Sequence, residues 1–172
     1  LEVKNLADRN GNVMTTDTVS FFYFVPVPAN QRDIVINEFY PDPSPSNGLP
    51  SGEFVEIYNA SNKVFDLNGW EIADGSSSRS LPSHILQPNG YVIICNSADA
   101  SAYQSFGTVV PVSSLPTLNN GGDDLRLEDN SGNTIDQLSY DLSWYQDPSR
   151  DGGGWSIEQI NPKTPCIGAN NF

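Results

Sequence analysis

Residues 52–70, with the sequence GEFVEIYNASNKVFDLNGW, are the stretch that decides the fold. Aromatic and β-branched residues dominate positions 54–58, a composition typical of a β-strand. Turn-forming residues follow at 59–62, and positions 67–72 predict a second strand. We expect Trp70 in that second segment to anchor the core. The stretch therefore predicts two strands around a buried tryptophan, and it does not by itself constitute an active site.

The composition around this stretch is that of an all-β protein. The chain has 172 residues with 14 Gly and 13 Pro, and no long segment shows the apolar periodicity of a helix. Hydrophobic residues make up 37%, including 8 Phe, 7 Tyr and 3 Trp, which is enough for a β core. The length suffices for one domain of ordinary size with an appendage.

The charge balance excludes two kinds of partner. Eight Lys and Arg stand against 21 Asp and Glu, a net charge of -13. Such a surface repels a phosphate backbone, and no basic cluster offsets it, so we predict no nucleic-acid partner. No stretch approaches the roughly 18 apolar residues of a membrane span, so we predict no direct membrane insertion.

Two cysteines, Cys95 and Cys166, fit no metal-binding motif. They are either two separate buried thiols or one disulfide, which would need an oxidising compartment. A disulfide would close a loop of about 70 residues and contribute roughly 4 kcal/mol to the free energy of unfolding in the chain-entropy model.

A proline-containing segment separates two parts of the chain. Residues 1–25 predict a β-hairpin, residues 26–32 a semi-extended linker, and residues 33–172 a β-sandwich. A lone hairpin is marginal in water, so this one must pack on something. It resembles the closing strands of bacterial Ig-like modules, and we interpret it as the remnant of an upstream module of a longer protein.

Within residues 33–172 the pattern predicts about seven to nine strands at the spacing of a sandwich. The most apolar run, residues 91–95, predicts a central strand, and residues 97–106 are the only helix candidate. Residues 124–128 and 134–138 alternate across an Asn- and Gly-containing turn, which predicts a β-hairpin. Residues 155–160 predict the final strand.

Several short motifs occur in a fixed order along the chain. They are residues 34–39 (IVINEF), 52–59 (GEFVEIYN), 67–72 (LNGWEI), 86–93 (LQPNGYVI), 122–127 (GDDLRL) and 129–132 (DNSG). In this order they resemble the lamin tail domain, an Ig-like β-sandwich, over residues 33–165. The resemblance implies no shared catalytic residues. It implies a module of the bacterial kind, found in exported proteins, with an extracellular, cell-surface or periplasmic location.

Four residues are candidates for hydrolytic chemistry. His84 is the only histidine, so a Ser-His-Asp or Cys-His mechanism would require it as the base. Its position at a turn instead favours an exposed loop histidine. Glu38, Glu53 and Glu56 are candidates for a glycosidase pair. Alternation turns Glu56 toward solvent. It turns Glu38 toward the core unless a bulge intervenes, where we expect a structural carboxylate held by backbone N–H groups.

Calcium is the one metal ligand that the sequence suggests, because oxygen side chains alternate in two Gly-containing turns. The candidates are Asp129, Ser131 and Asn133, and likewise Asp8, Asn10 and Asn12, with Asp141, Asp147 and Asp151 as a further acidic group. Neither turn has the downstream glutamate of a calcium loop, and hairpin turns need the same residues. We therefore expect no cofactor and no metal.

Trp144 and Tyr145 are candidates for a contact surface, because they lie between a strand and a Gly-rich loop. In that case they would bind a protein or stack on a sugar; otherwise they pack beneath the loop. Trp70 and Trp155 occupy strand positions and are expected in the core.

Together these observations predict a non-catalytic interaction or spacer module of an exported bacterial surface protein. Its partners would be an unidentified protein or glycan and the neighbouring domains of its own chain. The alternative is a carbohydrate- or calcium-dependent adhesion module, and a hydrolase is the weakest hypothesis.

Overall fold

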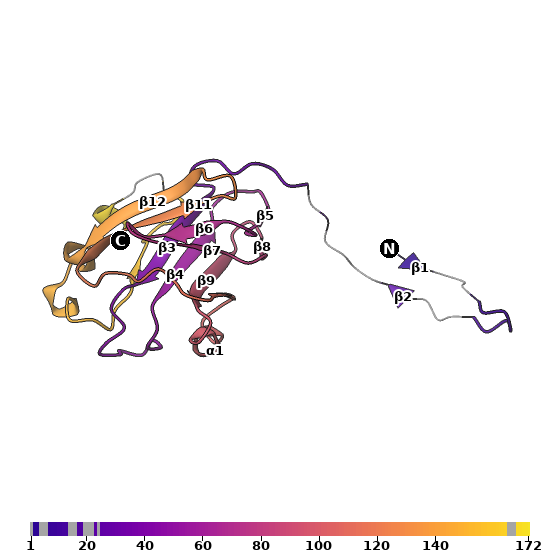
Figure 1. Ribbon diagram of the computed structural model, residues 1–172, viewed down its shortest axis with the longest axis horizontal. Coiled ribbons are helices and arrows are strands. Elements are labelled where there is room, and N and C mark those ends of the chain that lie inside the picture. Colours follow the sequence, from indigo (N-terminus) through magenta and orange to yellow (C-terminus); the bar gives the residue numbers. More distant parts are fainter. Residues whose placement is uncertain (1, 4–6, 14–16, 19–22, 24, 165–167) are drawn as a thin grey trace.

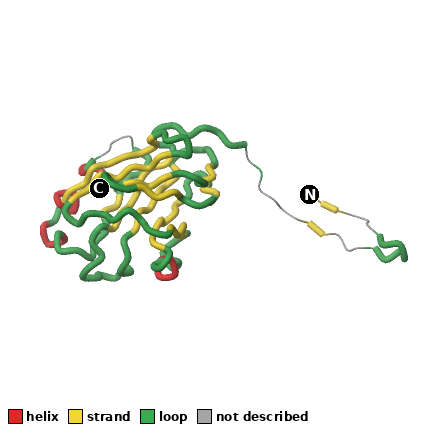
Figure 2. Tube along the Cα trace, viewed as in Figure 1, coloured by secondary structure: helices red, strands yellow, loops and turns green. Residues whose placement is uncertain are grey.

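The protein is an all-β sandwich of Ig-like type, as the sequence predicts (Figure 1). The computed structural model describes residues 2–3, 7–13, 17–18, 23, 25–164 and 168–172. A five-stranded sheet of order β10-β9-β4-β3-β13 packs against a four-stranded sheet of order β12-β11-β6-β7. A small β5-β8 pair accompanies them, and Figure 2 shows the few helical turns at the periphery.

The described strands and helical turns follow one another in short elements. The strands of the five-stranded sheet are β3 (Ile34–Tyr40), β4 (Phe54–Asn59), β9 (Tyr91–Asn96), β10 (Val109–Val112) and β13 (Ile157–Glu158). Those of the four-stranded sheet are β6 (Glu71–Ala73), β7 (Ser78–Ser80), β11 (Gly122–Glu128) and β12 (Thr134–Asp141). The remaining elements are β1 (Glu2–Val3), β2 (Asp17–Thr18), β5 (Phe65–Asp66), β8 (Ile85–Leu86), α1 (Ala100–Tyr103) and the 3-10 helices η1 (Leu142–Tyr145), η2 (Pro148–Arg150) and η3 (Ala169–Asn171).

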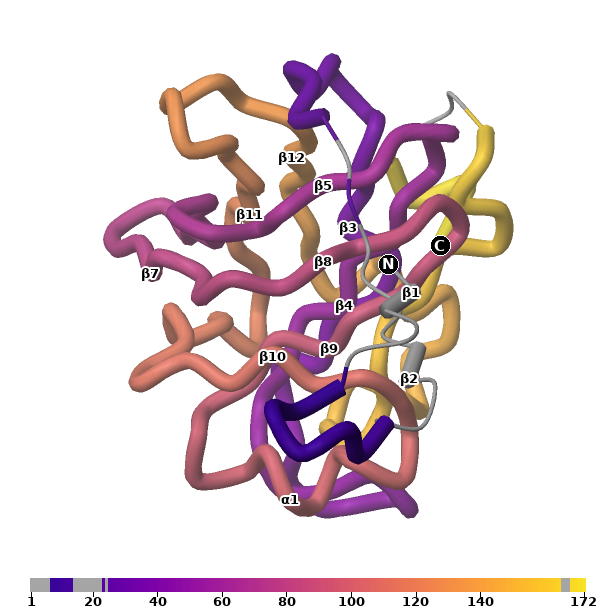
Figure 3. Tube along the Cα trace, turned by 90° about the vertical axis from the view of Figure 1, so that its right-hand side faces the viewer, coloured from indigo at the N-terminus to yellow at the C-terminus, as the bar shows by residue number. Residues whose placement is uncertain are grey.

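The five-stranded sheet forms because its strands alternate apolar residues on the inner face. Val55 and Ile57 of β4 and Val92 and Ile94 of β9 all point into the sandwich and are fully buried. β9 lies between β4 and β10, so the prediction of a central strand is confirmed. Its neighbour β10 runs parallel to it, an arrangement that follows from the crossover through α1 (Figure 3).

A β-bulge at Asn37 interrupts the alternation of β3. Ile36 pairs with Ile57, but Glu38 pairs with Glu56, so Asn37 is the extra residue. The extra residue moves every later side chain of β3 to the opposite face. Phe39 therefore enters the core and Glu38 leaves it. The bulge that the sequence analysis allowed for is present, so Glu38 is not an inward, structural carboxylate.

The buried carboxylate that ties the two sheets together is Asp136 of β12. Its Oδ2 accepts a hydrogen bond of 2.8 Å from the backbone N–H of Ile36, and its Oδ1 pairs with Arg32 Nη1 at 3.1 Å. β11 and β12 form the predicted antiparallel hairpin. Asp136 thus joins this hairpin to β3 across the edge of the sandwich.

Two local predictions need correction. Residues 67–70 form a turn in which the Trp70 N–H donates to the Leu67 carbonyl, with Gly69 at a φ of 76°, and β6 begins only at Glu71. The predicted helix at 97–106 shrinks to α1, because the Ser97 hydroxyl donates to the Val112 carbonyl instead of capping a helix. Trp70 itself is buried, as predicted.

Cys95 lies in a second apolar cluster on the outer face of the five-stranded sheet. It packs with Tyr40, Phe54, Ile93 and Tyr103, beneath α1. Cys95 is a free, fully buried thiol, and burial raises its pKa to about 11. The predicted disulfide is therefore not supported, and Cys166 lies outside the described residues.

The described part of the N-terminal segment contains a short antiparallel pair. β1 and β2 pair through Glu2 with Thr18 and Val3 with Asp17, and a bridge joins Ala7 to Val13. Most of the second strand predicted for this hairpin lies outside the described residues. The division into hairpin, linker and sandwich stays a prediction.

Candidate functional site

His84 does not form a catalytic triad with its polar neighbours. The Ser83 hydroxyl donates to the Asp66 carboxylate at 3.0 Å, and the His84 backbone N–H donates to the same carboxylate at 3.2 Å. A catalytic serine would instead donate to the imidazole. Burial lowers the pKa of His84, while Asp66 opposes that change. The residue is half-buried before β8 rather than fully exposed, and in the described part of the chain the neighbouring Ser83 hydroxyl bonds to Asp66 instead of to the imidazole.

The turn residues suggested as calcium ligands hold their own turns. The Asp129 carboxylate accepts hydrogen bonds of 2.9 Å from the backbone N–H groups of Ser131 and Asn133. Burial works to raise the pKa of Asp129, but these bonds and the Asn133 side chain outweigh it and lower the pKa. Asp8 closes its turn in the same way through Asn10 and Asn12. These are Asx turns, in which a side chain satisfies local backbone groups.

The second acidic group consists largely of helix caps. The Asp141 carboxylate accepts from the Ser143 N–H at the start of η1, and the Asp147 carboxylate accepts from the Ser149 N–H at the start of η2. Asp151 ends η2. Within the described parts of the chain, no group of three or more His, Cys, Asp or Glu is placed to hold a metal ion.

The aromatic residues suggested for an exposed contact surface are buried. Trp144 and Tyr145 are 8% and 6% exposed, and the Trp144 ring lies 4.8 Å from the ring of Phe172. Both side chains therefore pack into the core cluster instead of projecting from a rim. Trp155, expected in the core, is 40% exposed and lies beneath the Arg150 guanidinium at 4.9 Å. The expectation for Trp155 is wrong because β13 begins only after it.

A row of three glutamates crosses the outer face of the five-stranded sheet. Glu158 of β13 lies directly opposite Glu38 of β3, and Glu38 lies directly opposite Glu56 of β4. Residues directly opposite each other on neighbouring strands share a face. Because adjacent strands are about 4.8 Å apart, the row spans roughly 10 Å. We call these three residues the glutamate row.

Aromatic residues flank the glutamate row on both sides. Two positions further along β4 from Glu56, Tyr58 lies opposite Tyr91 of β9, with ring centroids 4.4 Å apart. In the other direction, Tyr40 and Phe54 lie 5.7 Å apart and belong to the cluster beneath α1. The glutamate row is thus a polar strip between two aromatic patches.

Two carboxylates of the row, those of Glu38 and Glu56, resist ionisation. Burial, followed by the charges of Glu158 and Glu56, raises the pKa of Glu38 to about 7, although a hydrogen bond with Ser156 opposes the change. Burial and the charge of Glu158 raise the pKa of Glu56 against the effect of its hydrogen bond with Asn37. Both shifts express the cost of holding negative charges side by side away from water.

The bulge also places an unsatisfied acceptor beside the row. The Asn37 side chain is buried, and its Nδ2 donates to Glu56 Oε1 at 2.9 Å. Its Oδ1 has no hydrogen-bond partner in the described structure. Among the described residues, the ion pairs involve other carboxylates: Arg32–Asp136, Lys63–Asp33, Arg126–Glu128 and Arg150–Asp147.

The structure therefore joins two of the three predicted glutamates and adds a third. Glu53 lies apart in the loop before β4, where it accepts a hydrogen bond of 3.1 Å from the Leu118 N–H. Sequence reasoning missed Glu158, because nothing in residues 155–160 shows which strand they pair with. Neither Glu38 nor Glu56 lines the described open pockets of about 430, 620 and 300 Å³.

The family model of the Lamin Tail Domain matches residues 27–141, from the linker to the end of β12. No curated protein matches the chain. The match includes Glu38 and Glu56 but ends before the strand that supplies Glu158.

Proposed function

Because the chain belongs to the lamin tail domain family, we propose that it is a non-catalytic interaction module of an exported bacterial surface protein. Domains of this family are generally non-catalytic and Ig-like. An Ig-like sandwich offers a rigid framework whose faces and loops can be used for contact, while its core supplies stability.

The observation that carries the proposal is how the polar side chains are used. Ser83 donates to Asp66 rather than to an imidazole, and Asp129 is occupied within its own turn. The two buried polar atoms without a described partner, Asn37 Oδ1 and Tyr40 Oη, lie on the outer side of the five-stranded sheet. Such a face suits contact with another molecule better than it suits enclosure of a substrate.

The way the linker joins the sandwich supports a role between neighbouring domains. Lys63 Nζ donates to the Pro28 carbonyl at 3.1 Å and pairs with Asp33 at 2.6 Å. These contacts set the direction in which the chain enters β3. A module that holds its entry segment in a fixed direction can also act as a spacer.

The surface charge suits a module that is exposed to water. A net charge of -13 keeps the module soluble and repels other acidic surfaces. No helix in the described parts of the chain is long and apolar enough to cross a membrane.

Turnover assays test the proposal most simply. We expect no hydrolysis of a panel of p-nitrophenyl esters, glycosides and phosphates by the 172-residue chain. Turnover that disappears in His84→Ala or in Glu38→Gln would contradict a non-catalytic role. We also expect calcium to leave the melting temperature unchanged, since a ligand that binds only the folded state must raise it. A rise would favour the calcium-dependent adhesion module.

A further inference from the structure

The bulge in β3 creates the glutamate row. Without it, Glu38 would point into the core, and only Glu56 and Glu158 would remain outside. With it, Asn37 and Glu38 both turn to the outer face, where the Asn37 amide reaches Glu56. Bulges often occur where a side chain must be re-aimed for function.

The row is costly to the isolated module. Like charges directly opposite each other on neighbouring strands destabilise a sheet. Glu38 has such a neighbour on both sides, and burial strengthens the repulsion because less water screens it. In the described structure no basic side chain pairs with any member of the row. An arrangement that opposes stability in this way is most easily understood as a binding surface.

The groups at the row call for a ligand that brings hydrogen-bond donors. Ionised carboxylates only accept hydrogen bonds, and the buried Asn37 Oδ1 is an acceptor without a described partner. An ammonium or a guanidinium group supplies both positive charge and N–H donors. A divalent metal fits less well, because the described carboxylates are not grouped as metal ligands.

The flanks of the row suit the stem of such a side chain. Tyr91 is 45% exposed and stacks on Tyr58, next to Glu56 along β4. Aromatic faces attract cations and cover the methylene stem of lysine or arginine. Lys163 already lies 6.0 Å from the Tyr58 ring, which shows that this patch accommodates an ammonium group.

We propose that the glutamate row, Glu158, Glu38 and Glu56, binds lysine or arginine side chains of an extended basic segment of a protein partner. This inference deepens the proposed function and rests on it. The partner's cations supply the ion pairs that no described basic side chain makes with the row.

The test is a titration of the isotope-labelled 172-residue chain with a hexalysine peptide at low ionic strength, followed by backbone amide NMR. We expect the amide shifts to gather on β3, β4 and β13. Neutralising the row as Glu38→Gln, Glu56→Gln and Glu158→Gln should weaken binding about tenfold or more, which corresponds to about 1.4 kcal/mol. A peptide with acetylated lysines should not bind.

The matched control removes the same charge from the other sheet. Glu71→Gln, Asp124→Asn and Glu128→Gln neutralise three acidic residues on the outer face of the four-stranded sheet. We expect this variant to lose about twofold in affinity at most, through the smaller net charge. If the triple row variant does not fold, Glu158→Gln alone, at an exposed position of the edge strand, serves in its place.

Binding should also strengthen as the pH rises through about 7, where Glu38 ionises. The groups that face Glu38 are Glu56 on β4, Glu158 and Ser156 at β13, and Tyr103 of α1. Of these, the other two glutamates repel its charge and Ser156 favours it.

Three results would overturn the inference. They are no binding by the unmodified chain, equal losses in both triple variants, and calcium binding at the row in place of the peptide. None of them depends on the turnover assays. Hydrolysis in the turnover assays would contradict the proposed function even if the peptide bound. The absence of peptide binding would leave the non-catalytic role intact.

Discussion

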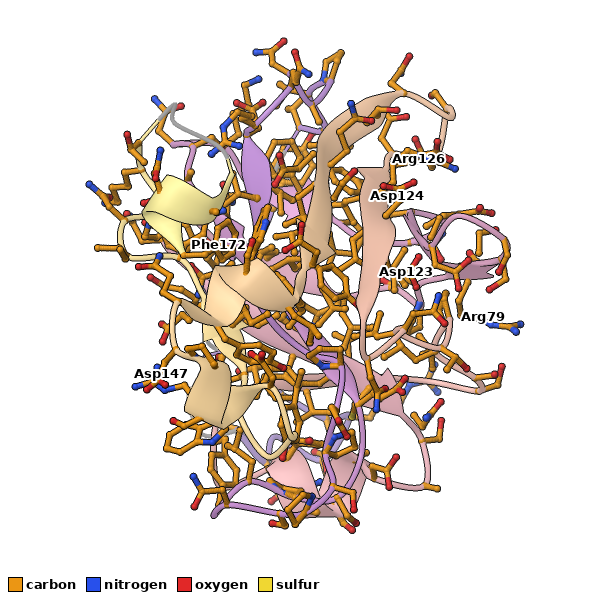
Figure 4. The ribbon with its side chains drawn as sticks, turned by 90° about the vertical axis from the view of Figure 1, so that its left-hand side faces the viewer. Arg79, Asp123, Asp124, Arg126, Asp147 and Phe172 are labelled. Atoms are coloured by element: carbon orange, nitrogen blue, oxygen red, sulfur yellow. The ribbon has the colours of Figure 1, made fainter. Side chains whose placement is uncertain are left out.

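The outer faces of both sheets carry acidic residues directly opposite each other, but the two faces differ in whether a basic residue pairs with them. On the four-stranded sheet, Glu71 and Glu128 lie directly opposite each other, and Arg126 Nε lies 2.6 Å from Glu128 Oε1. Figure 4 shows Arg126 beside Asp124 along β11. On the five-stranded sheet, Glu38 lies between two other glutamates, and no described basic residue pairs with it. One face compensates its negative charges internally, and the other leaves them for a partner.

The difference originates in one extra residue. β11 also has a register irregularity, between Leu127 and Glu128, but it keeps Arg126 within reach of Glu128. The bulge in β3 brings no cation to Glu38 and adds only an amide. Similar acidic composition can therefore serve solubility on one face and recognition on the other.

Deleting Asn37 should remove the bulge that distinguishes the two faces, and we expect this change to have the largest effect on stability. Without the bulge, Phe39 would turn to solvent and Glu38 into the core, so we expect a loss of about 5 kcal/mol or more in the free energy of unfolding. A loss of that size would unfold most domains. Urea denaturation followed by tryptophan fluorescence measures it. Asn37→Ala, which keeps the bulge, should cost only about 1 kcal/mol, and equal effects of the two changes would contradict the role of the bulge.

Phe39→Ala tests the inward half of the same rearrangement. Phe39 is fully buried, and its ring lies 4.6 Å from Tyr140 and 5.9 Å from Phe172. Truncating it should cost about 3–5 kcal/mol, because a cavity replaces the ring. Urea denaturation again gives the value. A loss below about 1 kcal/mol would mean that Phe39 is not a core residue.

Glu38→Gln tests the outward half and should increase stability. The native-state pKa of Glu38, about 7, lies above the ordinary value near 4.5, so the folded state binds a proton that the unfolded state has released. The stability that protonation of Glu38 contributes is therefore fully present below about pH 4.5, and it is lost as the pH rises through 7.

The difference between pKa values of 4.5 and about 7 corresponds to about 3 kcal/mol, so we expect Glu38→Gln to gain up to about 3 kcal/mol at pH 8 and nothing at pH 4. Melting curves at both pH values measure this gain. A variant that loses stability at pH 8 would show that the Glu38 charge is compensated in the folded chain.

Arg126→Gln should remove the ion pair of the four-stranded face, so that this face resembles the five-stranded one. We expect this change to have the smallest effect on stability. The Arg126 side chain is 40% exposed, so its ion pair with Glu128 contributes little. We expect a loss of about 0.5 kcal/mol, and a greater loss at low salt than at high salt. Equal losses at both salt concentrations would mean that Arg126 acts through packing instead of charge.

Strand periodicity made much of the fold predictable. The alternation at residues 124–128 and 134–138 led directly to the β11–β12 hairpin, and the apolar run at 91–95 led to β9. Trp70 was correctly expected in the core although it lies in a turn, because its burial depends on tertiary packing and not on its local conformation.

The candidate site could be predicted only in part. Alternation alone places Glu38 with Ile34 and Ile36, and it is the cost of burying a carboxylate instead of Phe39 that favours a bulge. The sequence marks that conflict without resolving it. The pairing of Glu158 with Glu38 joins residues far apart in the chain, and no local pattern reveals it.

The pKa of Glu38 is the most direct test of an uncompensated row. A titration of the side-chain carboxyl groups by carbon-detected NMR, assigned with the Glu38→Gln variant, measures it in the absence of any partner. We expect a pKa of about 7, because burial and two neighbouring glutamates oppose ionisation. A pKa at or below the ordinary value of 4.5 would show that cations or donors already compensate the row, and the row would then have no uncompensated charge to offer a partner.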